Sequence, residues 1–255
     1  MTTWIPLESN PDVMTKVNDH DFQLLILLFD VSFICIFLHK LGVPKEWSII
    51  DVYGLEPDLL ALVPKPVLAV ILLYPLSKKD DKLEDVEEDV KESDKIPSEP
   101  KDPDVFHMKQ CIHNACGTIA LIHSVANNLD SINLQDGFLK TFLEQSKNLS
   151  FAECGEVLMS SYEISGTHKE LAQEGQTEAP SVETPVYHHF VAFIHKNGVL
   201  YELDGRKPAP INHGSTCPER LLEDAARVCK EYMARDPEEM CFTVVALSNS
   251  DAEAL

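Results

Sequence analysis

The sequence predicts an α+β fold, and three features of the chain support this class. A continuous apolar run at Val67–Leu73 is typical of a strand buried in a sheet. Asn197–Gly198, a favoured pair for a two-residue type I′ turn, has strand-forming residues on both sides, which predicts an antiparallel hairpin. Segments 114–126 and 216–233 carry apolar residues every three or four positions, as amphipathic helices do.

Composition limits the classes of function that the chain can have. Its 255 residues are enough for a single domain with a real core, and we expect one domain over 1–255. The net charge of −21 makes nucleic acid and anionic membrane poor partners and favours a basic partner protein. The seven cysteines include no C-x-x-C pair, and the N-terminus lacks the pattern of a signal peptide. We therefore expect the protein in the cytosol, with the nucleus as a second candidate.

The N-terminal part begins with a loop and a helix start, where Pro11 follows a capping residue. An apolar run, Phe22–Leu38, then contains Asp30 near its middle. It is shorter than the roughly 20 residues of a membrane span, and a central aspartate costs about 2.5–3.5 kcal/mol there. We therefore favour an insertion in a globular domain over a membrane helix.

Further along, two segments have the composition of solvated chain. Residues 78–104 are rich in acidic residues and proline, which predicts an acidic linker. Residues Ser165–Tyr187 are polar and contain glycine and proline, which predicts a long surface loop. After the hairpin, Thr216 and Glu219 have the spacing of a capping box before the last helix, and residues 241–248 read as a final strand.

Cys116 is the first candidate for chemistry. It lies at the predicted start of the helix 114–126, behind the capping residue Asn114. The positive end of the helix dipole and the unpaired backbone N–H groups there favour a thiolate, the nucleophilic form of the side chain. A small apolar residue packed at a helix start is an equal alternative. A metal site with Cys111 and His113 is disfavoured because no fourth ligand is near in the sequence.

A nucleophilic cysteine needs a base, and the hairpin selects one of ten histidines. Pairing outward from the turn places Asp204 opposite Val191 and diagonal to His189 on the same face, whereas His188 points to the other face. The alternative is that His189 and Asp204 are solvated residues at strand ends. Gln110, ahead of Cys116, is a candidate oxyanion donor or else a surface residue. The chain order of these residue types is that of papain-like folds.

At this point the sequence shows a family resemblance. The blocks "WIPLESNP", "DVYGLEPDLL", "MKQCIHNACGTIALIHSVANN", "EGQTEAPS" and "LYELDGRKPAPINHG" resemble the small single-domain ubiquitin C-terminal hydrolases. The resemblance implies a papain-like cysteine peptidase with a central antiparallel sheet flanked by helices and a knotted backbone. It also implies that the residues Ser165–Tyr187 form the loop that crosses the active-site cleft and restricts leaving groups to small or flexible ones.

The family's catalytic roles fall on residues already selected. The resemblance implies Cys116 as nucleophile, His189 as general acid and base, Asp204 as the group that orients the histidine, and Gln110 as oxyanion stabiliser, with no cofactor and no metal. The implied activity is deubiquitinating thiol hydrolysis after the C-terminal glycine of ubiquitin by a monomer, with a ubiquitin-like protein as a further candidate substrate.

The chain departs from the family at residues 17–36, an apolar insertion that interrupts the first helix. We consider a genuine insertion and a gene-model artefact as its two origins. The insertion motivates a second functional hypothesis, a ubiquitin-binding protein with poor turnover because the fold is disturbed. A membrane tether through Phe22–Leu38 is a third.

Overall fold

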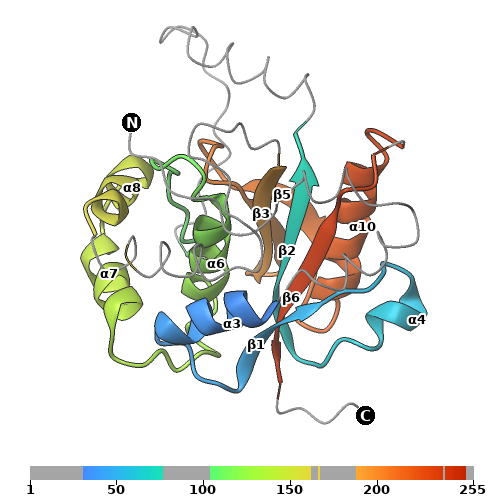
Figure 1. Ribbon diagram of the computed structural model, residues 1–255, viewed down its shortest axis with the longest axis horizontal. Helices are drawn as coiled ribbons and strands as arrows, with labels where there is room; N and C mark the ends of the chain where they lie inside the picture. The colour runs from blue at the N-terminus through green and yellow to red at the C-terminus, as the bar shows by residue number, and fades with distance from the viewer. Residues whose placement is uncertain (1–30, 77–103, 162–165, 167–187, 238, 251–255) are drawn as a thin grey trace, which may run out of the picture.

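The computed structural model describes residues 31–76, 104–161, 166, 188–237 and 239–250. In this part of the chain, strands form one antiparallel sheet with the order β1-β6-β2-β3-β4-β5 (Figure 1). The strands are β1 (Trp47–Asp51), β2 (Val67–Pro75), β3 (His188–Lys196), β4 (Val199–Leu203), β5 (Ile211–Ser215) and β6 (Thr243–Asn249). Strands that are distant in sequence are therefore neighbours at the centre of the sheet.

Helices cover both faces of this sheet. They are α3 (Val31–Lys40), α4 (Pro57–Leu60), α6 (Cys116–Ala126), α7 (Phe138–Ser146), α8 (Phe151–Met159) and α10 (Leu221–Met233). Helices α3, α6, α7 and α8 lie on one side, and α4 and α10 lie on the other (Figure 1). Each side has its own hydrophobic core against the sheet. The predicted class, a central antiparallel sheet flanked by helices, is confirmed.

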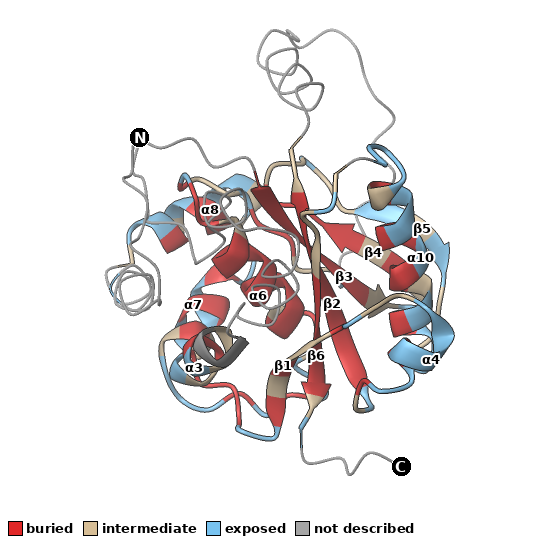
Figure 2. Cartoon of the chain, turned by 45° about the vertical axis from the view of Figure 1, so that its right-hand side comes forward, coloured by how far each residue is buried: buried red, intermediate tan, exposed pale blue. Residues whose placement is uncertain are grey.

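Strand β2 shows why an apolar run fits this architecture. Every residue from Val67 to Tyr74 is buried, and the strand lies between β6 and β3. Ala69 and Ile71 face the core on the α6 side, whereas Val70 and Leu72 face the core on the α10 side. Continuous apolar strands are typical of parallel sheets because helices cover both of their faces. Here the same covering produces the same pattern in an antiparallel sheet (Figure 2).

The hairpin of β3 and β4 has the predicted register along the whole of β4, from Lys196↔Val199 to Ala192↔Leu203. The turn residues Asn197 and Gly198 have φ values of 50° and 81°, as a type I′ turn requires. One detail of the prediction is wrong. Strand β4 ends at Leu203, so Asp204 is not paired with Val191 in the ladder but lies just beyond the strand.

The predicted helix caps are also corrected. The residue that caps α6 is Ala115, which makes no side-chain cap hydrogen bond, and Asn114 before it has a positive φ of 62°. The capping box predicted at Thr216 does not form, because α10 begins only at Leu221. The Thr216 hydroxyl instead donates to Asp224 at 2.8 Å.

Other features went unpredicted. A reciprocal capping box forms at Ser150 and Glu153, at the start of α8. The helix α6 carries the predicted core stripe but is buried on all sides from Gly117 to Val125. It packs against β3 and β2 on one side, with α7 and α8 beyond it (Figure 1). Complete burial accounts for the many apolar residues outside the predicted stripe.

The segment 17–36 falls only partly on described residues. Its end, residues 31–36, belongs to α3, where Ile34 and Cys35 pack against the core and Ile49 N–H donates to Cys35 Sγ at 3.2 Å. Residues 17–30 lie outside the described part of the chain, as do most of the acidic linker and of Ser165–Tyr187. Predictions about those segments, and about the backbone knot, stay predictions. None of the helices among the described residues is long and apolar enough to cross a membrane.

Candidate active site

The candidate nucleophile, Cys116, is the first residue of α6 and is partly exposed. The first N–H groups of a helix have no intrahelical acceptors, so the sulfur lies where free donors and the positive helix end meet. Burial opposes ionisation of the thiol. The interaction of the thiol with the His189 ring and its charge, with smaller effects of the Phe190 backbone and Arg206, outweighs burial and lowers the pKa of Cys116 below its usual 9.0. The environment therefore favours a thiolate.

The candidate base is held by a carboxylate in the interior. His189 Nε2 lies 2.7 Å from Asp204 Oδ1, with side-chain exposures of 1% and 3%. Because a carboxylate only accepts, Nε2 carries the hydrogen and donates it. The other nitrogen, Nδ1, is buried and makes no hydrogen bond within standard distance to the described residues. It is therefore the nitrogen left to exchange a proton with the Cys116 sulfur or with a substrate.

This pair has strongly shifted pKa values. Burial disfavours the charged ring of His189, but the charge and hydrogen bond of Asp204, together with Cys116, raise its pKa to about 9. Burial likewise disfavours the carboxylate, but His189 and the Arg206 backbone N–H hold the pKa of Asp204 at about 2. Near neutral pH the site therefore contains an imidazolium paired with a carboxylate, beside a thiol whose pKa is lowered. The alternative that His189 and Asp204 are solvated strand ends is wrong.

Gln110 lies against the turn that follows Asp204. Its backbone N–H donates to the Gly205 carbonyl at 2.8 Å. Its side-chain Nε2 donates to the Ile112 carbonyl at 3.1 Å, and the same carbonyl accepts the N–H of Ala115, the residue before Cys116. One of the two amide hydrogens of Gln110 is thus engaged, and the second remains to donate to an oxyanion. The structure brings the four predicted residues into one connected cluster.

The alternative metal ligands point elsewhere. Cys111 Sγ lies against α8, where a Cβ added to Gly155 would approach it to 2.7 Å, and burial raises its pKa. His113 is exposed. Within the described ranges, no group of three or more His, Cys, Asp or Glu side chains could hold a metal ion.

A thiol at a helix start beside a carboxylate-bound imidazole is the arrangement of a cysteine peptidase. A family model described as "Ubiquitin carboxyl-terminal hydrolase, family 1" matches residues 28–234. The chain belongs to the ubiquitin carboxyl-terminal hydrolase family. Both predictions, the family and the cysteine peptidase class, are confirmed. The match begins inside the segment 17–36.

Relatives of this ubiquitin carboxyl-terminal hydrolase family member cover almost the whole chain. A ubiquitin carboxyl-terminal hydrolase of Drosophila melanogaster is 48% identical over 249 residues, with 97% of this chain and 98% of the relative covered. One from Aplysia californica is 44% identical, with coverages of 92% and 97%. A solved structure, the UCH37 catalytic domain of Trichinella spiralis bound to ubiquitin vinyl methyl ester, superimposes with a TM-score of 0.71 at 24% identity, covering 98% and 97% of the chains. The last comparison supports the fold.

Three residues near the site of this family member were not predicted. Tyr74 pairs with His189 across the β2–β3 ladder, and its ring meets the histidine ring edge-on at 5.9 Å. Gly205 has no room for a Cβ, which would lie 2.9 Å from Ile119 Cγ2 and 3.0 Å from Gln110 Cβ. Arg206 lowers the pKa of both Cys116 and Asp204. Only Gly205 and Arg206 had a signal in the sequence, because they directly follow the predicted Asp204.

Proposed function

We propose that this chain hydrolyses the bond after the C-terminal glycine of ubiquitin, with Cys116 as the nucleophile. The observation that carries the proposal is the buried His189–Asp204 pair at 2.7 Å beside a thiol whose pKa is lowered. Membership of the family and the binding of a ubiquitin derivative by the Trichinella spiralis relative support ubiquitin as the substrate.

The first step forms a thioester. The Cys116 thiolate attacks the carbonyl carbon of the terminal glycine, and negative charge moves onto the carbonyl oxygen. The backbone N–H of Cys116 and the second amide N–H of Gln110 are the donors for this oxyanion. The His189 imidazolium then gives its Nδ1 proton to the leaving amine, and the C–N bond breaks.

The second step returns the enzyme to its starting state. Neutral His189 accepts a proton from water at Nδ1, and the hydroxide attacks the thioester carbonyl. Breakdown of the second tetrahedral intermediate releases ubiquitin with a free carboxylate and restores the Cys116 thiolate beside the imidazolium. Asp204 holds Nε2–H throughout, so the ring keeps the tautomer and orientation that both transfers need.

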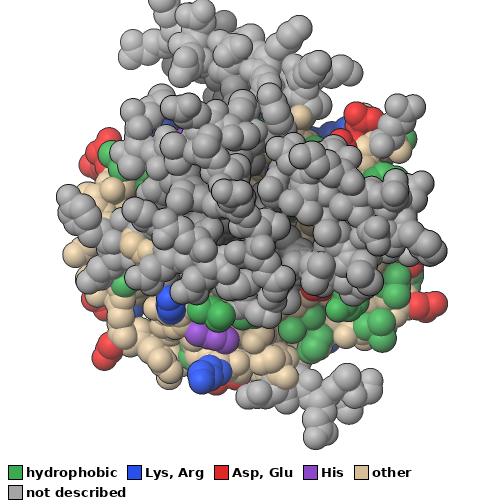
Figure 3. All heavy atoms as spheres, in the orientation of Figure 1, with side chains coloured by type: hydrophobic (Ala, Val, Ile, Leu, Met, Phe, Trp, Pro, Cys, Tyr) green, Lys and Arg blue, Asp and Glu red, His purple; other side chains and the backbone are tan. Residues whose placement is uncertain are grey.

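We further propose that the enzyme is a cytosolic or nuclear monomer that releases small or flexible adducts, and that a ubiquitin-like protein is a second substrate. The net charge of −21 supports a partner with a basic face. Hydrophobic side chains gather over the α4 corner in Figure 3, and Tyr53 and Leu62 next to α4 are 69% and 64% exposed. Light scattering tests the monomer, and cell fractionation tests the cytosolic or nuclear location. A comparison of turnover for folded and peptide adducts of ubiquitin tests the preference for small or flexible adducts.

Turnover of a fluorogenic amide of the ubiquitin C-terminus tests the central proposal. Cys116→Ala must abolish turnover, whereas Cys241→Ala, a matched control at a thiol whose pKa is raised to about 11, must keep it. Binding of ubiquitin without turnover by the unmodified chain would instead support the binding-protein hypothesis. Deletion of residues 17–30, which leaves all of α3, then separates an effect of the insertion from an inactive site.

Alkylation provides an independent measure of the thiolate. Burial raises the pKa of Cys111, Cys229 and Cys241, whereas the pKa of Cys116 is lowered. Iodoacetamide at pH 7 should therefore modify Cys116 first, as read by peptide mass spectrometry. Equal rates at all these positions would contradict an activated thiolate.

A further inference from the structure

His107 contacts the main chain of Asp204, the residue that carries the candidate catalytic carboxylate. Its Nε2 lies 2.9 Å from the backbone carbonyl oxygen of Asp204. A carbonyl oxygen only accepts, so Nε2 is the protonated nitrogen and donates. The imidazole is 9% exposed, so water competes little for this hydrogen bond.

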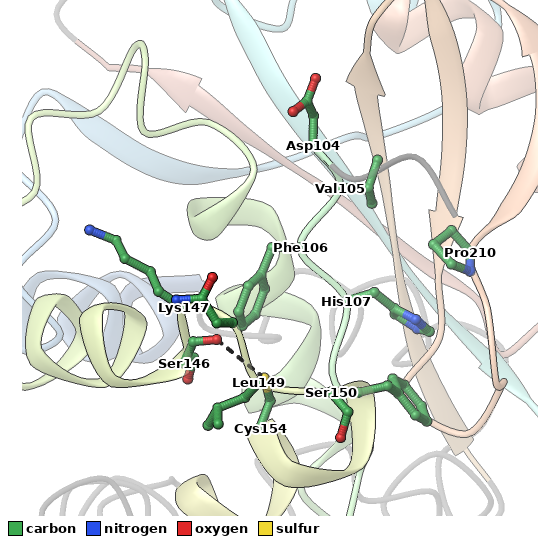
Figure 4. A pocket seen from close by; sticks show the side chains of 12 residues that line it. Asp104, Val105, Phe106, His107, Ser146, Lys147, Leu149, Ser150, Cys154 and Pro210 are labelled. Atoms are coloured by element: carbon green, nitrogen blue, oxygen red, sulfur yellow. Dashed lines mark hydrogen bonds between the residues drawn. The ribbon is translucent and has the colours of Figure 1, made fainter. Parts of the chain in front are cut away.

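Aromatic neighbours fix the plane of the His107 ring. The ring of Phe151 stacks on it with centroids 4.6 Å apart and planes inclined by 30°. The ring of His123 lies at 5.2 Å, inclined by 38°. His107 also borders a pocket of about 340 Å³ between the residues 104–107, the α7–α8 connection and Pro210 (Figure 4). The ring is therefore oriented by stacking, and an aromatic replacement has space to adapt.

The bond from His107 completes the anchoring of Asp204. The backbone carbonyl of Asp204 accepts from His107 and from Lys207 N–H at 3.0 Å. Its carboxylate oxygen Oδ1 accepts from His189 Nε2 at 2.7 Å and from Arg206 N–H at 2.9 Å. Lys207 and Arg206 belong to the same turn as Asp204. Among the hydrogen bonds that Asp204 accepts from the described residues, only those from His107 and His189 come from other segments of the chain.

We propose that His107 is a positioning residue of the hydrolase reaction: it holds the main chain of Asp204 so that the carboxylate keeps its hydrogen bond to His189. This inference rests on the proposed function of the site. Loss of the bond leaves the Asp204 carbonyl with only Lys207 N–H of its own turn, and the nearest bond from another segment to this main chain is then that of Gln110 N–H to the Gly205 carbonyl. The carboxylate therefore moves more freely relative to the imidazole. The imidazolium is then less stabilised, and with it the thiolate.

The charged groups around the affected pair determine how pH reports this change. Asp204 faces His189 and the charge of Arg206, and His189 also faces Cys116. Asp204 further interacts electrostatically with His123, whose pKa burial lowers to about 3. His123 is therefore neutral throughout the working range, and a shift of the pH profile reports on the pair of His189 and Cys116.

Two substitutions at His107 and one control test the proposal. His107→Phe keeps the stacking ring and removes the donor, whereas His107→Gln restores an N–H near the position of Nε2. The matched control is His39→Phe, because His39 Nε2 also bonds a backbone carbonyl, that of Trp47 at 3.0 Å, far along the chain from the site. The readouts are kcat and KM for the ubiquitin C-terminal amide, and the rate of Cys116 alkylation, each against pH.

We expect His107→Phe to lower kcat by about two- to tenfold with KM unchanged, the effect of one net hydrogen bond. The alkaline limb of the kcat profile of His107→Phe should move to lower pH, and the acid limb of its Cys116 alkylation profile should move to higher pH. His107→Gln should recover most of kcat and most of the shift of the two pH limbs, and His39→Phe should change neither kcat nor the limbs. Equal effects of His107→Phe and His39→Phe, or unchanged profiles in His107→Phe, would overturn the proposal. If the unmodified chain lacks turnover, the proposed function fails, but the alkylation profiles still decide the role of His107.

Discussion

Replacement of Asp204 by asparagine tests the electrostatic core of the site. The amide has the shape of the carboxylate and keeps an oxygen that accepts from His189 Nε2 at the present 2.7 Å. It removes the negative charge of Asp204, the largest of the influences that, with the Asp204 hydrogen bond and Cys116, raise the pKa of His189 from 6.5 to about 9. That rise corresponds to roughly 3 kcal/mol in favour of the imidazolium. Both side chains are almost fully buried, so solvent screens little of it.

The expected effect depends on pH in a way that can be calculated. With a pKa of about 9, roughly nine-tenths of His189 is protonated at pH 8, whereas a pKa near 6.5 leaves only about 3%. At pH 6 the corresponding fractions are nearly 1 and about three-quarters. If the pKa returned fully to 6.5, Asp204→Asn would lose about 30-fold at pH 8 through this effect, which is the upper bound because Cys116 still raises the pKa, but less than about twofold at pH 6.

The assay is kcat/KM for the ubiquitin C-terminal amide from pH 6 to 10. The alkaline limb should lie near pH 9 in the unmodified protein and move toward pH 6.5 in Asp204→Asn. Asp136→Asn, at an exposed carboxylate paired with Lys140, is the control and should leave the limb in place. A limb that stays near pH 9 in Asp204→Asn, with activity reduced equally at every pH, would refute the reasoning.

Three further predictions concern the same pair, a second buried carboxylate and the tight turn. The raised pKa of His189 contributes stability that is fully present below pH 6.5 and is lost as pH rises through about 9. The lowered pKa of Asp204 contributes stability that is present above pH 3.8 and is lost as pH falls through about 2. Urea unfolding should therefore show the largest loss of unfolding free energy in Asp204→Asn between about pH 4 and 6.5. Tyr232→Phe removes the 2.7 Å donor to Glu202, which is 1% exposed, and should lower the free energy of unfolding by about 1–3 kcal/mol; an unchanged value would show that Glu202 finds another donor. Gly205→Ala would place a Cβ 2.9 Å from Ile119 Cγ2 in the core, 3.0 Å from Gln110 Cβ and 3.2 Å from the Gln110 backbone N, so both kcat and thermal stability should fall, and unchanged turnover would contradict a role for the Gln110 contact.

Local patterns in the sequence were sufficient for several strands and for the choice of the base. The register of β3 and β4 follows from a two-residue turn and the alternation of side chains, since neither depends on the rest of the fold. The continuous apolar run predicted β2 because burial on both faces leaves no polar position. That His189 and Asp204 face each other followed from counting residues outward from Asn197–Gly198.

Local patterns failed where competing contacts decide the structure. Thr216 has the spacing of a capping residue, but Asp224 takes its hydroxyl, and α10 begins later. Asn114 is a good capping residue by type, yet its positive φ places the helix start at Cys116 itself. In both cases a contact or backbone conformation set by the surrounding fold overrides the local preference.

The amino-acid sequence alone determined which residue types could react, the hairpin that presents His189, and the family to which the chain belongs. Tertiary structure decided the rest: the burial that shifts the pKa values of the imidazole and carboxylate, the contact of Gln110 with the turn at Gly205, and the hydrogen bond from His107 to the Asp204 carbonyl. These depend on segments about 100 residues apart that the sheet order β2-β3-β4 and the packing of α6 bring together. Short-range spacing cannot encode such contacts, because they exist only once both faces of the sheet are covered.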